Sequence, residues 1–248
     1  MTRSWLLYFR SNQAEPDEIP WLQISPPAPE VARVLVSSLQ QFQLGEGATG
    51  LTFLELGRRH AEATGDLDFV ETLALFIAEE QRHSALLARY LRAIGAAVLE
   101  YEWVDGIFRR LRKLAGLECM VTVLVTAEIV SIPYYRAVYR MTSCPVLSAV
   151  CLRILREEAQ HLLFQAVTLN CLRRGRPQFI QHLVHLAHML LLTGTSCMVW
   201  LQHGEVMRRG GFSFARFLRS AFGTLTHVAQ AANAPKSTAM GATAPTHR

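Results

Sequence analysis

EEQRH at residues 79–83 and EEAQH at residues 157–161 are two copies of one pattern, Glu-Glu-x-x-His, and both occur where apolar residues recur at helical spacing. Residues three apart in a helix lie on one face, so the second Glu and the His of each copy present a carboxylate and an imidazole to a common point. Two such faces can hold two metal ions. The pattern therefore predicts an all-α fold around a metal centre that contains Glu80, His83, Glu158 and His161.

Helical spacing continues through most of the chain, and alternating strand-like runs are nearly absent. After a Pro-rich lead, Gly and Pro residues mark where one helix stops and the next begins. The residues from 31 to a turn at 63–66 are predicted to form one long helix. Further helices are predicted at 67–94, 118–140, 146–172 and 178–207, with a short one at 214–222. The connection 95–117 is predicted to be a long crossover with a short helix at 107–114.

Equal depth in a helical hairpin nominates two more ligands. Residues at the same depth of an antiparallel pair lie equally far from the turn, because both helices rise by the same amount per residue. The midpoint of Glu128 and Glu158 is residue 143, within the predicted turn, and the midpoint of Glu46 and Glu80 is residue 63, also in a turn. Glu55 would place its midpoint with Glu80 beyond the turn. Glu46 and Glu128 are therefore predicted to complete the site.

The glycines around Glu46, at positions 45, 47 and 50, weaken the first helix and predict close packing or a local distortion.

The predicted ligand set is chemically selective. Four carboxylates and two imidazoles suit iron or manganese better than structural zinc, and two divalent ions would balance the four negative charges. Without metal, carboxylates that converge in a core would be strongly destabilising. We therefore expect two iron ions, in the Fe²⁺ or Fe³⁺ state, with manganese as an alternative. Glu79 and Glu157 point about 100° away from the ligand face and are expected to support the ligands or to lie at the surface.

Residues Ile77–Gly95, IAEEQRHSALLARYLRAIG, resemble the second-helix signature of soluble acyl carrier protein desaturases. The remainder resembles only the wider superfamily of ferritin-like, carboxylate-bridged di-iron proteins, and the chain is shorter than those desaturases. The resemblance implies a ferritin-like four-helix bundle with a long crossover and additional C-terminal helices. It also implies that the six residues nominated above bind iron. On this basis residues 1–30 are an N-terminal extension, 31–228 the di-metal domain and 229–248 a disordered tail.

Relatives that activate oxygen suggest roles for two further positions. They place a hydroxyl residue one turn after the third-helix Glu to relay protons, and here Ser131 follows Glu128 by three; the alternative is that Ser131 bonds to its own helix. Ribonucleotide reductase small subunits carry a radical tyrosine four residues after the second-helix His, where this chain has Leu87, so no stored radical is expected. Either an apolar substrate surround or ordinary core packing accounts for Phe76, Leu86, Leu87 and Leu124.

Three classes of function fit these features. The first is a dioxygen-dependent oxidoreductase that hydroxylates, desaturates or N-oxygenates a small-molecule or carrier-bound organic substrate. Its electrons would come from a separate ferredoxin or reductase, because the chain has no flavin or nucleotide fingerprint. The second is a ferroxidase or iron-storage protein. The third is a tRNA hydroxylase, favoured by the net charge of +5 and by basic clusters at 109–113, 173–176 and 208–209.

Composition also bears on compartment and assembly. Five cysteines, with no C-x-x-C pair, argue against a disulfide framework or a zinc-cysteine site, and the apolar run Trp5–Phe9 is too short for a secretory signal. We therefore expect a cytoplasmic protein; a homodimer is compatible with the sequence.

Residues 183–201 carry no charge, but their polar groups favour a buried helix over a transmembrane span. On this helix, core or surface roles are expected for His182, His185 and His188.

Overall fold

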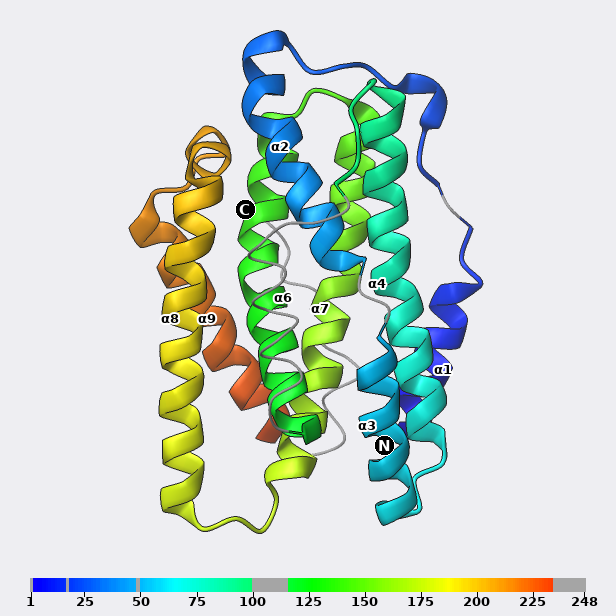
Figure 1. Cartoon of the computed structure of the whole chain (residues 1–248), viewed down its shortest axis with the longest axis vertical. Coiled ribbons are helices and arrows are strands. Elements are labelled where there is room, and N and C mark those ends of the chain that lie inside the picture. Colours follow the sequence, from blue (N-terminus) through cyan, green and yellow to red (C-terminus); the bar gives the residue numbers. More distant parts are fainter. Residues whose placement is uncertain (1, 17, 48–49, 100–115, 234–248) are drawn as a thin grey trace. The chain divides into compact units, whose positions relative to one another are not determined.

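The computed structural model describes residues 2–16, 18–47, 50–99 and 116–233, and every regular element in these ranges is a helix (Figure 1). The all-α prediction is therefore confirmed. The chain forms two compact units, one from Met1–Met120 with Thr142–Cys151, and the other from Val121–Met141 with Leu152–Arg248. The short helix predicted at 107–114 lies outside the described residues.

The helices are α1 (Thr2–Gln13), α2 (Pro29–Glu46), α3 (Leu51–Thr64), α4 (Asp68–Ala93), α6 (Gly116–Met141), α7 (Pro145–Arg173), α8 (Gln178–Arg209) and α9 (Phe214–Asn233), with a 3₁₀ turn η1 at Trp21–Gln23. The helices predicted at 67–94, 118–140, 146–172 and 178–207 are confirmed as α4, α6, α7 and α8. Their observed ends differ from the predicted ones by no more than two residues.

The prediction of one continuous first helix is wrong. It is divided into α2, which ends at Glu46, and α3, which begins at Leu51. Gly50 precedes α3 with a φ of 68°, a conformation that glycine adopts without strain. A Cβ at Gly50 would lie 2.6 Å from the Cδ1 atom of Ile77, so this junction also packs closely on α4. The predicted distortion around Glu46 is thus a complete break.

The prediction of a short last helix is also wrong, because α9 continues to Asn233 and enters the segment assigned to the tail. Its buried residues explain the extension. Phe217, Ala221, Leu225 and Val228 recur every three or four residues, so one apolar face continues past the predicted end at Phe222. Residues 234–248 of the predicted tail lie outside the described part of the chain.

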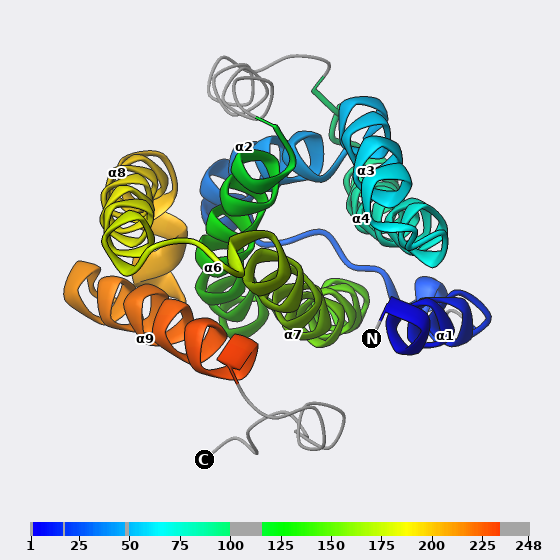
Figure 2. The same cartoon turned by 90° about the horizontal axis from the view of Figure 1, so that it is seen from below.

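In the first unit, α1, α2 and α3 all pack against α4 (Figure 2). Phe76 of α4 is almost fully buried and lies at the centre of this packing. Its ring meets Phe9 of α1 and Phe53 of α3 edge to face, with centroids 6.2 Å and 6.1 Å away. Such edge-to-face contacts are favourable beyond the area they bury. The N-terminal segment therefore belongs to the core of this unit through α1.

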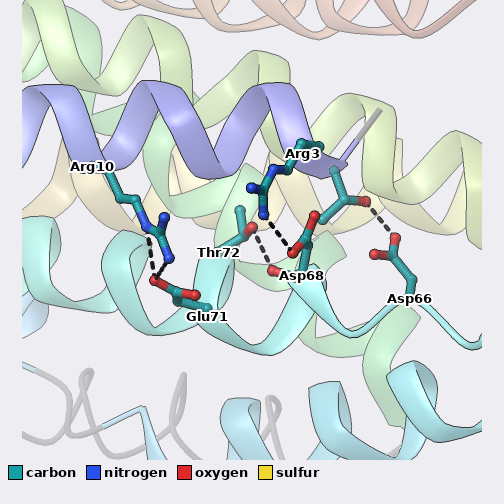
Figure 3. A network of polar contacts seen from close by, with 7 residues as sticks. Arg3, Arg10, Asp66, Asp68, Glu71 and Thr72 are labelled. Carbon is teal, nitrogen blue, oxygen red and sulfur yellow. Dashed lines mark hydrogen bonds and ion pairs between the residues drawn. The ribbon is translucent and has the colours of Figure 1, made fainter.

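Polar contacts also join α1 to the first turns of α4 (Figure 3). Arg3 and Arg10 form ion pairs with Asp68 and Glu71, with N–O distances of 3.1 Å and 2.9 Å, and the Thr2 hydroxyl donates to Asp66. Exposed pairs of this kind contribute about 0–1 kcal/mol each. The fully buried side chains of α1, Leu6 and Phe9, therefore supply most of its attachment, and the ion pairs set its position along α4.

In the second unit, α6 and α7 are joined by a hydrogen bond from the Arg173 guanidinium to the Thr122 hydroxyl, and α8 packs beside α9 (Figure 2). Gly210, which ends α8, lies against Ala137 of α6. A Cβ at Gly210 would fall 2.3 Å from the Ala137 Cα atom, so only glycine permits this approach.

Both α6 and α8 are long and apolar enough to cross a membrane by length and composition. The apolar window of α6 is 67% buried, as in the core helix of a soluble bundle, whereas that of α8 is 28% buried. The prediction of a buried helix at residues 183–201 is therefore wrong, because Leu183, Leu190 and Leu201 are exposed.

Candidate metal centre

The first unit brings Glu46, Glu80 and His83 together. Glu46 is the last residue of α2, and Glu80 and His83 lie one turn apart on α4. Each offers a ligand atom, and the three atoms lie within 4.8 Å of one another. His83 is fully buried, and the two glutamates are half-buried. Glu46, which the hairpin argument selected, is therefore one of the three, and we call these residues the α2–α4 triad.

A pair of hydrogen bonds one turn from this triad sets the register of α2 on α4. The Gln43 amide donates to the Ser84 hydroxyl at 2.9 Å, and that hydroxyl donates to the Gln43 carbonyl at 2.8 Å. Gly47 makes room for the contact, because a Cβ there would lie 3.1 Å from the Ser84 Oγ atom. The sequence pattern did not predict this clamp, although the midpoint of Gln43 and Ser84 lies within half a residue of the midpoint that selected Glu46.

The second unit brings Glu128, Glu158 and His161 together in the same way. Glu128 lies on α6 and the other two lie on α7, with one ligand atom from each within 4.8 Å of the others. All three side chains are buried, and the His161 Nδ1 atom is 3.8 Å from the Glu158 carboxylate. We call these residues the α6–α7 triad.

Gln165 holds the α6–α7 triad in place and was not predicted from the sequence. Its side-chain amide is fully buried and donates to the Glu128 carboxylate. Gln165 follows His161 by four residues, so both project from one face of α7. That four-residue spacing could have identified Gln165, because it places a polar side chain on the ligand face of α7, whereas the corresponding position after His83 on α4 is the apolar Leu87.

The two triads have the same donor set, two carboxylates and one imidazole. Oxygen-rich sites with a single imidazole suit iron or manganese, whereas structural zinc prefers cysteine and histidine. Two carboxylates beside one imidazole carry an excess of negative charge, which is costly where they are buried, as in the α6–α7 triad, unless a cation compensates it. The donor chemistry of each triad therefore fits one divalent or trivalent metal ion.

Glu79 and Glu157, the first residues of the two Glu-Glu-x-x-His copies, are buried and not at the surface. The Asn12 amide of α1 donates to Glu79 at 2.6 Å. Glu157 accepts from the Arg153 guanidinium at 2.9 Å, and that arginine is itself buried. In each copy the second Glu belongs to a triad, and the first Glu accepts a hydrogen bond from a side chain that is neutral in one copy (Asn12) and cationic in the other (Arg153). The arrangement stabilises the helix segment that carries the ligand side chains.

Ser131 donates its hydroxyl to the Glu128 backbone carbonyl at 3.0 Å, which is the helix back-bonding alternative. Of the residues expected to form an apolar surround, Phe76, Leu86 and Leu87 are buried and Leu124 is half-buried.

Neither triad includes a histidine of α8. His182 and His185 are exposed, and His188 is buried. A fourth histidine, His203, is buried with its ring 5.6 Å from that of Tyr134, and burial lowers its pKa to about 4. Desolvation disfavours the charged imidazolium, which explains the direction of the shift.

Acidification is therefore expected to destabilise the second unit. As the pH falls, His203 gains a proton near its usual pKa of about 6.5 in the unfolded chain, but only near pH 4 in the folded chain. Because the unfolded state binds more protons between these values, the free energy of unfolding falls as pH drops, by about 3 kcal/mol for this residue. Urea denaturation at several pH values measures the slope of the free energy of unfolding against pH. The variant His203→Phe should reduce this slope and His182→Gln should not, while His188, whose pKa burial also lowers to about 4, keeps part of it; an equal slope in both variants would contradict the assignment.

The comparisons with known proteins bear on the fold. No family model matches the chain, and no curated protein matches it in sequence. Among solved structures, the chain is similar to a mutant of an R2-like ligand-binding oxidase with an aerobically reconstituted Mn/Fe cofactor. The TM-score is 0.65 at 14% identity, and the match covers 93% of this chain and 92% of that one. The chain therefore has the fold of the ferritin-like helical bundles. The likeness of Ile77–Gly95 to desaturases stays a resemblance of one helix.

Proposed function

We propose that the α2–α4 triad and the α6–α7 triad together form one dimetal centre, and that the protein is a dioxygen-dependent oxidoreductase acting on an organic substrate. The observation that carries the proposal is the matched pair of triads, each with two carboxylates and one imidazole within 4.8 Å. Two divalent ions would balance the four carboxylates. The similar solved structure is that of an oxidase with a Mn/Fe cofactor, which supports iron with manganese as an alternative.

The metal pair would supply the redox chemistry of dioxygen. For hydroxylation, one oxygen atom enters a C–H or N–H bond of the substrate. The other leaves as water with two protons and with two electrons from a ferredoxin or flavin reductase. Desaturation instead removes two hydrogens from the substrate, and with the same two electrons and two protons both oxygen atoms leave as water.

The residues of this chain would orient the ligands and limit side reactions. Gln165 fixes one oxygen of Glu128, and the Gln43–Ser84 clamp fixes the height of Glu46. Leu87 is fully buried and has no oxidisable group, which favours use of the oxidising power on a substrate. Fully buried Phe76 adds to an apolar environment that excludes water. Ser131 stays our candidate for carrying a proton, since its hydroxyl retains lone pairs that can accept one.

A single-turnover experiment tests the proposal. The di-ferrous protein is mixed rapidly with ¹⁸O₂, alone and with panels of fatty acyl compounds, aromatic amines and tRNA, and products are analysed by mass. We expect one organic compound to gain a single ¹⁸O atom or to lose two hydrogens, with no more than one product per dimetal centre. Ferric mineral beyond two irons per chain without organic product would overturn the proposal in favour of a ferroxidase. A hydroxylated nucleoside would assign the substrate to tRNA.

A further inference from the structure

One face of α8 is apolar and exposed. Its large side chains, Phe179, Leu183, Leu186, Leu190 and Leu201, each expose between 56% and 82% of their surface. Gly194 and Cys197 lie on the same face and are exposed too. We call these seven residues the α8 stripe. No charged residue occurs from Gln178 to Gly204, so nothing along the stripe would repel an apolar partner.

The spacing of the stripe is symmetrical. Its successive intervals are four, three, four, four, three and four residues, so Leu190 is the centre and the pattern repeats after eleven residues. An eleven-residue repeat keeps an apolar face aligned along a nearly straight or slightly right-handed helix pair. A two-fold axis through Leu190 would map every member of the stripe onto another member in an antiparallel copy.

Side-chain sizes match across this axis. Leu186 would face Gly194 of the second copy, and Leu183 would face Cys197. Large residues thus oppose small ones in these two pairings, which lets the helices approach closely there, whereas Phe179 would face Leu201 and Leu190 would face its own copy at the ends and centre of the stripe. At Gly194 a Cβ would meet no atom within 4 Å among the described residues outside its own stretch of helix, so the space beside it is open to a partner.

We propose that the α8 stripe is the interface of an antiparallel homodimer with its two-fold axis at Leu190. The area is sufficient. At about 100 Å² exposed per large side chain, two copies would bury about 1,000 Å² from these residues alone, near the lower bound for a specific interface. Phe179 and Leu201 are about 33 Å apart at 1.5 Å per residue, so the contact runs along most of α8. A membrane surface would select apolar residues but not this pairing of large with small.

Disulfide trapping tests the register. In the proposed dimer the two copies of Cys197 lie about 21 Å apart along the axis, because each is seven residues from the centre. Oxidation should therefore leave the native Cys197 uncrosslinked. Leu183→Cys places a thiol opposite Cys197 of the second copy and should give a covalent dimer, which Cys197→Ser in the same chain should abolish. A Cys197–Cys197 disulfide in the native protein, or no crosslink in Leu183→Cys, would overturn the register.

A second variant separates dimerisation from membrane binding. Gly194→Leu fills the space for Leu186 of the partner, and its Cβ meets none of the described atoms around Gly194 within 4 Å. We therefore expect a folded monomer by light scattering where the native protein is a dimer at micromolar concentration. Circular dichroism checks the fold. The same change would strengthen insertion into a bilayer. Flotation of the native protein with phosphatidylcholine–phosphatidylglycerol vesicles, increased in Gly194→Leu, would overturn the proposal, as would a native monomer.

Discussion

Replacing Glu80 and Glu158 together with alanine is expected to abolish the binding of two iron ions per chain. The variant removes one of the two carboxylates of each triad, whose ligand atoms lie within 4.8 Å of one another. Loss of one ligand of three should weaken each metal by more than about 100-fold, since even partners that only orient a ligand are worth about 10–100-fold. Metal analysis after anaerobic loading and desalting measures the stoichiometry.

A matched control is available in Glu55, the glutamate that the hairpin argument rejected. It lies on α3, is half-exposed and pairs with Arg59 on its own helix. Glu55→Ala should keep two irons per chain. Retention of two irons by the Glu80→Ala, Glu158→Ala variant would contradict the ligand assignment. Single variants refine the result, because Glu46→Ala and Glu128→Ala should each weaken one metal before the other.

Replacing Arg153 with methionine is expected to destabilise the fold by about 3–5 kcal/mol, because it removes a buried cation that pairs with the buried Glu157 carboxylate. The Arg153 Nε atom lies 2.9 Å from the Glu157 Oε1 atom, and the side chains of Arg153 and Glu157 are 7% and 0% exposed. For a chain of this size that loss corresponds to a fall in Tm of about 6–20 °C. Thermal and urea unfolding of the metal-free protein measure it without interference from metal binding.

The control for this prediction is an exposed pair of equal length on α8. Arg209 and Glu205 are also 2.9 Å apart, but their side chains are 37% and 46% exposed. Arg209→Met should therefore cost no more than about 1 kcal/mol. Equal losses in the two variants would show that burial does not set the strength of the Arg153–Glu157 pair. An added Glu157→Gln change in Arg153→Met should recover part of the loss, since it removes the buried charge.

The sequence determined the helices that carry the Glu-x-x-His copies, because long apolar periodicity specifies helix type and approximate ends. It also determined which glutamates share a depth with them, since helical rise makes depth a matter of counting residues from the turn. Glu46 and Glu128 could be selected in this way without knowledge of any contact. The break between α2 and α3 could be predicted only in part, because glycines weaken a helix but do not determine whether it bends or ends there.

Only the tertiary structure determined which side chains contact one another across helices, because helical periodicity does not specify what surrounds a side chain. The burial of Glu79 against Asn12 and of Glu157 against Arg153 could not be inferred from helix geometry, which gives a direction around the axis but not what lies there. The amide of Gln165 on Glu128 and the clamp of Gln43 on Ser84 each join two helices. The sequence by itself therefore identified the candidate ligands, because the helical period determines which residues of one helix share a face. Only the packing of one helix on another decided what holds those residues in place.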